Sequence, residues 1–119
     1  MDLDDLIGPL PAPLGRWMLR RMVAGGVRYG HGFVVLLVRG ADPDALAGVL
    51  RGADIFAHWD GGDLLALLPD TDRSGGASVV ERVREATGAA IGAAHWSGDL
   101  AEDLIERAER ALAADLAQA

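Results

Sequence analysis

Hydrophobic positions in the first third of the chain follow two different spacings. Behind Pro13, a residue suited to the first turn of a helix, apolar side chains recur at helical spacing: Leu14, Trp17, Met18 and Met22. This spacing predicts a helix to about Ala24, ended by Gly25-Gly26. Phe33 to Val38 is a continuous, β-branched-rich apolar run. Such a run is typical of a strand buried on both faces, and we expect this one to be central.

The middle of the chain predicts a helix followed by a hairpin. Asp42-Pro43 has the residue types of an N-cap and a first helical position, and Gly52 is the expected stop. Two apolar runs follow, Ile55 to Trp59 and Leu64 to Leu68, joined by Asp60-Gly61-Gly62-Asp63. Asp-Gly and Gly-Gly between apolar runs strongly favour a β-hairpin.

The last third predicts a helix, a strand and a final helix. We expect a helix from about Ser74 to Ala86 and a strand from Ala89 to His95. Asp99 and Glu102 have the spacing of a capping box before the final helix. That helix carries one apolar stripe: Leu100, Leu104, Ile105, Ala108, Leu112 and Leu116.

This order of elements predicts the fold class. Behind an irregular lead-in over residues 1–12 come a helix and then a βαββαβ unit with a last helix. We therefore expect an α/β fold (an α+β sandwich) with a ferredoxin-like core, of the kind found in nucleotide cyclases, plus an extra N-terminal and a C-terminal helix. The 119 residues suit one domain, 1–119.

Composition excludes several classes of function. The net charge of −7 argues against nucleic acid as the partner, since phosphate binding needs a basic face. No apolar run is long enough to span a bilayer, so we expect a cytoplasmic protein with no membrane partner. The chain has no cysteine, which excludes a disulfide framework and a thiolate metal site. We expect no cofactor.

The segment from Arg51 to Thr71 resembles the centre of a GGDEF (diguanylate cyclase) domain, a bacterial signalling family. Aligning Leu67-Leu68-Pro69-Asp70-Thr71 with the family's Leu-Pro-Asp-Thr ending places Asp60, Gly61, Gly62, Asp63 and Leu64 on the five signature positions. The flanks agree: Asp5 to Pro11 resembles the family's opening Asp-x-Leu-Thr-Gly-Leu-Pro, and Ala90 to Ala94 its Ser-Ile-Gly-x-Ala strand. The resemblance covers nearly the whole chain.

The departures from the family imply a degenerate, inactive member. The family holds two metal ions with an Asp at the end of the first strand and with the acidic third signature residue. Here Gly62 stands at the third position, and the first strand ends in Arg39-Gly40. Mg²⁺ binds poorly without carboxylates, and Arg39 would repel it. The stretch before Arg51 is also too short for the family's guanine-recognising helix, so we expect no catalytic residue and no metal site.

The resemblance also implies a ligand site. Many GGDEF domains bind cyclic di-GMP at an inhibitory site made of an Arg-x-x-Asp before the signature and a later Arg; here these are Arg51, Asp54 and Arg82. Arginine forks suit guanine edges or phosphates, and an Asp accepts from guanine N–H groups. About one Arg-x-x-Asp is expected by chance in this composition, so a turn and a solvated helix face remain the alternative.

Three functions follow from these residues. The leading hypothesis is a non-catalytic module that binds cyclic di-GMP and acts through a protein partner, with a homodimer around the ligand as one arrangement. The second is a ligand-free interaction or dimerisation domain. The third is residual nucleotide chemistry at Asp60 and Asp63.

The chain has three histidines, which lie far apart in the sequence: His31, His58 and His95. Isolated histidines usually form local hydrogen bonds, so we do not expect these three to bind a shared metal ion.

Overall fold

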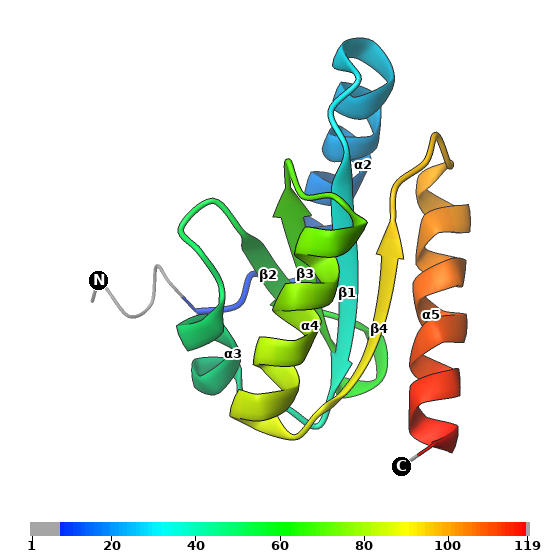
Figure 1. The fold of residues 1–119 in the computed structure, drawn as a ribbon. Coiled ribbons are helices and arrows are strands. Elements are labelled where there is room, and N and C mark those ends of the chain that lie inside the picture. Colours follow the sequence, from blue (N-terminus) through cyan, green and yellow to red (C-terminus); the bar gives the residue numbers. More distant parts are fainter. Residues whose placement is uncertain (1–7, 119) are drawn as a thin grey trace, which may run out of the picture.

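The computed structural model of the chain describes residues 8–118. Its elements (Figure 1) are α2 (Ala12–Tyr29), β1 (Phe33–Arg39), α3 (Pro43–Val49), β2 (Ile55–His58), the 3₁₀ turn η1 (Asp60–Gly62), β3 (Leu64–Pro69), α4 (Arg73–Thr87), β4 (Ala90–His95) and α5 (Ala101–Ala117). The predicted helices and strands are all present, in the predicted order. Residues 1–7, which include Asp5 to Ile7 of the family-like opening, lie outside the described residues.

The four strands form one antiparallel sheet in the order β2-β3-β1-β4. The apolar run of β1 is buried from Phe33 to Val38, which confirms that this strand is central and covered on both faces. The lead-in is less irregular than predicted. Leu10 adds a short parallel bridge to the outer edge of β2, where its N–H donates to the Phe56 carbonyl at 3.0 Å.

Helices cover both faces of the sheet (Figure 1). On one face, α3 and α4 enclose a core that includes Leu46, Val79 and Val83. On the other face, α2 and α5 enclose a second core that includes Leu19, Leu104 and Leu112. The arrangement is the predicted α+β sandwich: a βαββαβ core with its two helices on one face, and the N- and C-terminal helices on the other.

Helix α2 runs five residues beyond the predicted end, because its glycine pair lies inside the helix. The helix ends instead at Gly30, whose φ of 73° is left-handed and whose N–H donates to the Gly26 carbonyl. An ideal Cβ built on Gly26 would lie 2.7 Å from the Trp96 ring. The missing side chain of Gly26 lets the helix backbone lie close to Trp96. This tertiary contact outweighs the poor helix propensity of glycine.

Helix α3 begins as predicted and ends earlier. The Asp42 carboxylate accepts a hydrogen bond from the Ala45 N–H at 3.2 Å, which confirms the N-cap. The helix ends at Val49 rather than at Gly52, with Leu50 in an extended conformation. Leu50 packs against the core on the α3/α4 face, and this burial accounts for the early end.

The predicted capping box at Asp99 and Glu102 is wrong. Helix α5 has Leu100 at its N-cap position, with no side-chain cap, and Leu100 is exposed rather than part of the apolar stripe. The Asp99 carboxylate turns instead to Arg107, accepting from Nε at 3.0 Å and from a terminal nitrogen at 2.8 Å. Arg107 gives this carboxylate two hydrogen bonds from a charged donor, whereas a cap would give it a single backbone N–H, which explains the preference for Arg107.

Within residues 8–118, no helix combines the length and the apolar character that crossing a bilayer requires.

Candidate functional site

The hairpin that carries the signature residues is closed by its own backbone. The Trp59 N–H donates to the Asp63 carbonyl at 2.8 Å, and Gly61 and Gly62 have φ of 70° and 83°. Side chains other than glycine adopt this left-handed region at a cost. The predicted hairpin is confirmed, and Gly62 serves the turn at the position where the family carries an acid.

Asp63, at the fourth signature position, is buried and paired with Arg39. Arg39 Nε donates to Oδ1 at 2.8 Å and a terminal nitrogen to Oδ2 at 3.1 Å, while the Asp63 side chain is only 7% exposed. The hydrogen bond, followed by the charge of Asp63, raises the pKa of Arg39 above its ordinary value. Both carboxylate oxygens therefore face a permanent cation.

The register of the sheet brings this pair together. Val38 lies opposite Leu64, so Arg39, at the end of β1, lies beside Asp63, the residue just before β3. The end of the first strand is where the resembled family carries a metal-binding Asp. In this chain a guanidinium stands there and satisfies the neighbouring carboxylate directly, so the two partners already neutralise each other.

Asp60, at the first signature position, is exposed and bound to α2. The Arg16 guanidinium donates to Asp60 Oδ2 at 2.6 Å, and its central carbon lies 4.2 Å from the centre of the Trp59 ring. This contact joins the hairpin to the helix in front of it by an ion pair and a cation–π interaction. Trp59 is buried in the core.

Arg51 and Asp54 are brought together in a turn after α3. Asp54 Oδ2 accepts the Arg51 N–H at 2.8 Å and lies 3.8 Å from Arg51 Nε, while Arg51 also reaches Thr71 Oγ1 at 3.4 Å. The Asp54 side chain is 2% exposed, and its Oδ1 has no hydrogen-bond partner in residues 8–118. A buried carboxylate oxygen without a donor is costly and marks a place where a further donor is needed.

A cavity of about 420 Å³ adjoins this turn. Arg51, Asp54 and Phe56 are among its lining residues, and the Arg51 side chain itself is largely exposed. The turn therefore places an exposed guanidinium and a buried carboxylate beside one cavity. The combination suits a ligand with both acceptor and donor groups on one edge.

Arg82, the third predicted ligand residue, lies on the exposed side of α4. Over residues 8–118 it makes no hydrogen bond or ion pair, and it does not line the cavity beside Arg51. Helices α3 and α4 pack against each other, which places Arg82 on the helix next to the Arg51 turn. The structure thus brings Arg51 and Asp54 into contact, whereas Arg82 contacts neither of them through a hydrogen bond or an ion pair.

The histidines lie in separate surroundings. His31 contacts Asp70 at 3.1 Å on the surface, whereas His95 lies at the end of β4. In the part of the chain that the structure describes, no three His, Asp or Glu side chains are arranged to hold a metal ion.

Sequence reasoning missed the partners of the signature carboxylates. It treated Arg39 only as a residue that repels metal ions, and it assigned Arg16 no role. Both interactions join residues far apart in the chain, 24 positions for Arg39 and Asp63 and 44 for Arg16 and Asp60. The antiparallel register of the first and third strands, had it been worked out residue by residue, would have placed Arg39 beside Asp63.

The sheet order, the two helical layers and the signature hairpin define the GGDEF fold of diguanylate cyclase domains. Solved structures with this fold include the GGDEF domain of DgcB from Caulobacter crescentus in complex with c-di-GMP, with a TM-score of 0.83, 15% identity, and coverage of 94% of this chain and 88% of that one. The GGDEF domain of FimX from Pseudomonas aeruginosa matches with a TM-score of 0.79 and 14% identity, over 95% of this chain and 93% of that one.

The diguanylate cyclase SiaD from Pseudomonas aeruginosa, solved in complex with its activator SiaC, matches with a TM-score of 0.82 and 21% identity. The match covers 91% of this chain and only 55% of the SiaD chain, so this chain spans about half of that protein. No protein-family model matches the sequence. No curated protein matches it either. At these identities the likeness establishes the fold, and function has to be argued from the site.

Proposed function

We propose that this chain is a catalytically inactive GGDEF-fold signalling module that binds cyclic di-GMP through Arg51, Asp54 and Arg82 and acts through a protein partner. The observation that carries the proposal is the bidentate Arg39–Asp63 pair. It occupies the place where metal-assisted phosphoryl transfer needs unpaired carboxylates. A domain that keeps this fold without those carboxylates is suited to binding rather than to turnover.

The ligand half of the proposal is supported by the Arg51–Asp54 turn. Asp54 Oδ1 lacks a donor among the described residues, and guanine N1–H and N2–H groups are donors of the right kind. The exposed Arg51 fork suits the guanine N7/O6 edge or a phosphate. Since Oδ1 is buried, binding requires a small movement of the side chains over it. The DgcB GGDEF domain, which has the same fold, was solved with c-di-GMP.

Titration calorimetry of the 119-residue chain with cyclic di-GMP tests this function. We expect saturable heat with the wild type and at least about tenfold weaker binding for Arg51→Ala, since a charge-assisted hydrogen bond contributes about 1.5–3 kcal/mol. Arg82→Ala should weaken binding as well if Arg82 closes over the ligand. The matched control is Arg110→Ala, which removes an exposed arginine from α5. Absence of heat with the intact protein would refute the proposal.

A second function, a dimerisation domain without a ligand, is favoured by the surface of α2. Large apolar side chains are exposed there: Leu14, Trp17, Val27 and Tyr29, at 41%, 53%, 72% and 67%. Leu14 and Trp17, one turn apart near the start of α2, form the part of this surface that suits an apolar contact. This function predicts a stable dimer in sedimentation velocity without nucleotide, lost in Trp17→Glu, and no heat in the titration.

A further inference from the structure

Strand β4 is an edge of the sheet, because it pairs only with β1. In an antiparallel ladder, alternate residues direct both backbone groups to the same side. The Trp96 N–H donates to the Phe33 carbonyl at 2.9 Å, so Trp96 faces β1. By alternation His95, Ala93 and Ile91 direct their N–H and C=O groups outward, away from the sheet.

Helix α5 caps this outward edge at both ends. The Asp115 carboxylate accepts the Ile91 N–H at 2.8 Å, and Arg107 donates to the His95 carbonyl at 2.6 Å. Between the caps, neither backbone group of Ala93 has a partner among the described residues, and Ala93 is exposed. An unpaired edge of this kind is a template for an added strand.

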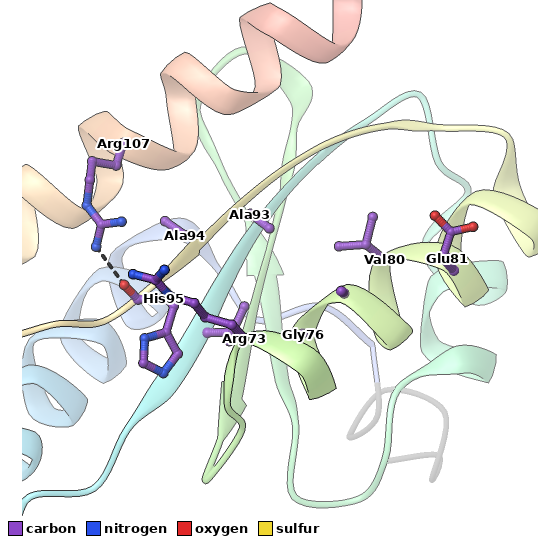
Figure 2. A pocket seen from close by; sticks show the side chains of 10 residues that line it. Arg73, Gly76, Val80, Glu81, Ala93, Ala94, His95 and Arg107 are labelled. Carbon is purple, nitrogen blue, oxygen red and sulfur yellow. Dashed lines mark hydrogen bonds between the residues drawn. The ribbon is translucent and has the colours of Figure 1, made fainter.

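A groove of about 510 Å³ lies beside Ala93, between β4 and α4 (Figure 2). Small residues keep it open, namely Gly76, Ala77, Ala93 and Ala94. The ends of the groove differ in charge. Figure 2 shows Arg73 and His95 close together at one end, with Arg107 nearby, and Glu81 at the other.

The basic end has polar groups without partners. Across residues 8–118, Arg73 makes no hydrogen bond or ion pair, and His95 Nδ1 is buried without a partner. Arg107 at this end is already paired with Asp99, so Arg73 supplies the charge that has no counter-ion, in a chain whose net charge is −7. The charge of Arg73 complements a carboxylate.

We propose that this groove binds an extended segment of a partner protein, which pairs with the backbone of Ala93 and places an acidic side chain against Arg73 and His95. A second copy of this chain fits less well. The added strand would then be β4 itself, Ala90–His95, which carries no acidic side chain to place against Arg73 and His95. The proposal does not depend on cyclic di-GMP, whose proposed residues lie outside this groove.

Selection from a phage-displayed library of random ten-residue peptides on the immobilised full chain tests the site. We expect peptides in which an acidic residue lies within a β-branched stretch. A labelled copy of the selected peptide, followed by fluorescence polarisation, should bind at least about tenfold more weakly to Arg73→Glu and to Ala93→Pro. Because the Ala93 N–H points outward, proline there removes no bond of the sheet.

Two further variants keep the result interpretable. Ala93→Glu retains the N–H but puts a negative charge at the edge, where it repels an acidic segment, and it should also weaken binding if Ala93→Pro fails to fold by circular dichroism. Arg110→Glu, on α5 and outside the groove, should bind like the wild type. Failure of the selection, or peptides that bind the Ala93 variants like the wild type, would overturn the proposal. A dimer of the free protein that is lost in Ala93→Pro would also overturn it, in favour of a second copy.

Discussion

Gly25 and Gly26 are neighbours in α2 with opposite surroundings. A Cβ on Gly25 meets nothing within 4 Å, whereas one on Gly26 would lie 2.7 Å from Trp96 Cζ3 and 3.1 Å from the His31 carbonyl oxygen. We expect Gly25→Ala to raise the free energy of unfolding by about 0.5–1 kcal/mol, since alanine is the better helix former. Gly26→Ala should lower it by about 1–3 kcal/mol through overpacking.

Urea denaturation followed by far-UV circular dichroism measures both variants under identical conditions. Gly25→Ala is the control for Gly26→Ala, because the two replacements have the same intrinsic helix propensity. If Gly25→Ala and Gly26→Ala stabilised the protein equally, the Trp96 ring would have to move aside easily. The contact between Gly26 and Trp96 would then not explain why α2 continues through the two glycines.

A carboxylate near each end of α5 is paired with an arginine, one just before the helix and one in its last turn. Asp115 binds Arg84 at 2.8 Å and the Ile91 N–H, and Asp99 binds Arg107. The pKa of Asp115 is lowered by the hydrogen bond from Arg84 and then by that from Ile91, and the pKa of Asp99 is lowered chiefly by Arg107. The folded state therefore favours the ionised form of both groups.

The lowered pKa values of Asp99 and Asp115 predict that the folded state loses stability in acid. A carboxylate whose pKa is depressed by folding stabilises the protein above its unfolded pKa of about 3.9, and the contribution is lost as the pH falls through the lower folded value. We expect Asp115→Asn to destabilise the protein at neutral pH and to approach the wild-type stability as the pH falls below about 4. Thermal unfolding at several pH values measures the difference. If the wild type and Asp115→Asn differed in stability by the same amount at every pH, the charge of Asp115 would not be the cause of the difference.

The whole molecule keeps the GGDEF fold while a single helix, α3, fills the connection between β1 and β2. In the resembled family a further helix in this connection recognises guanine. Under the proposed function, this short connection and the Arg39–Asp63 pair together deprive substrate and metal of the contacts they have in that family. On that proposal, a single replacement is not expected to give cyclase activity.

We expect no pyrophosphate when the protein is incubated with GTP and Mg²⁺ or Mn²⁺, with an active diguanylate cyclase run in parallel. Arg39→Asp combined with Gly62→Glu should also remain inactive, because it restores carboxylates without the guanine contacts, and Gly62 has a left-handed φ of 83° that disfavours other side chains. Pyrophosphate release by the wild type that disappears in Asp63→Asn would establish the residual chemistry of the third hypothesis.

Local patterns were sufficient for the elements and for the family-like hairpin. The uninterrupted apolar run at Phe33 to Val38 indicated a doubly covered strand, and Asp42-Pro43 indicated a helix start, because both signals lie within a few residues. The lack of an acid at Gly62 was also visible from the sequence alone.

Tertiary structure decided what each charged or glycine position contacts. Asp99 has the spacing of a cap yet binds Arg107, Gly26 has the character of a helix stop yet lies against Trp96, and Asp63 belongs to a turn yet pairs with Arg39. Each outcome depends on a partner many positions away, brought close by sheet register or helix packing. A sequence specifies such partners only through the fold as a whole, since contact energies between distant residues leave no local pattern.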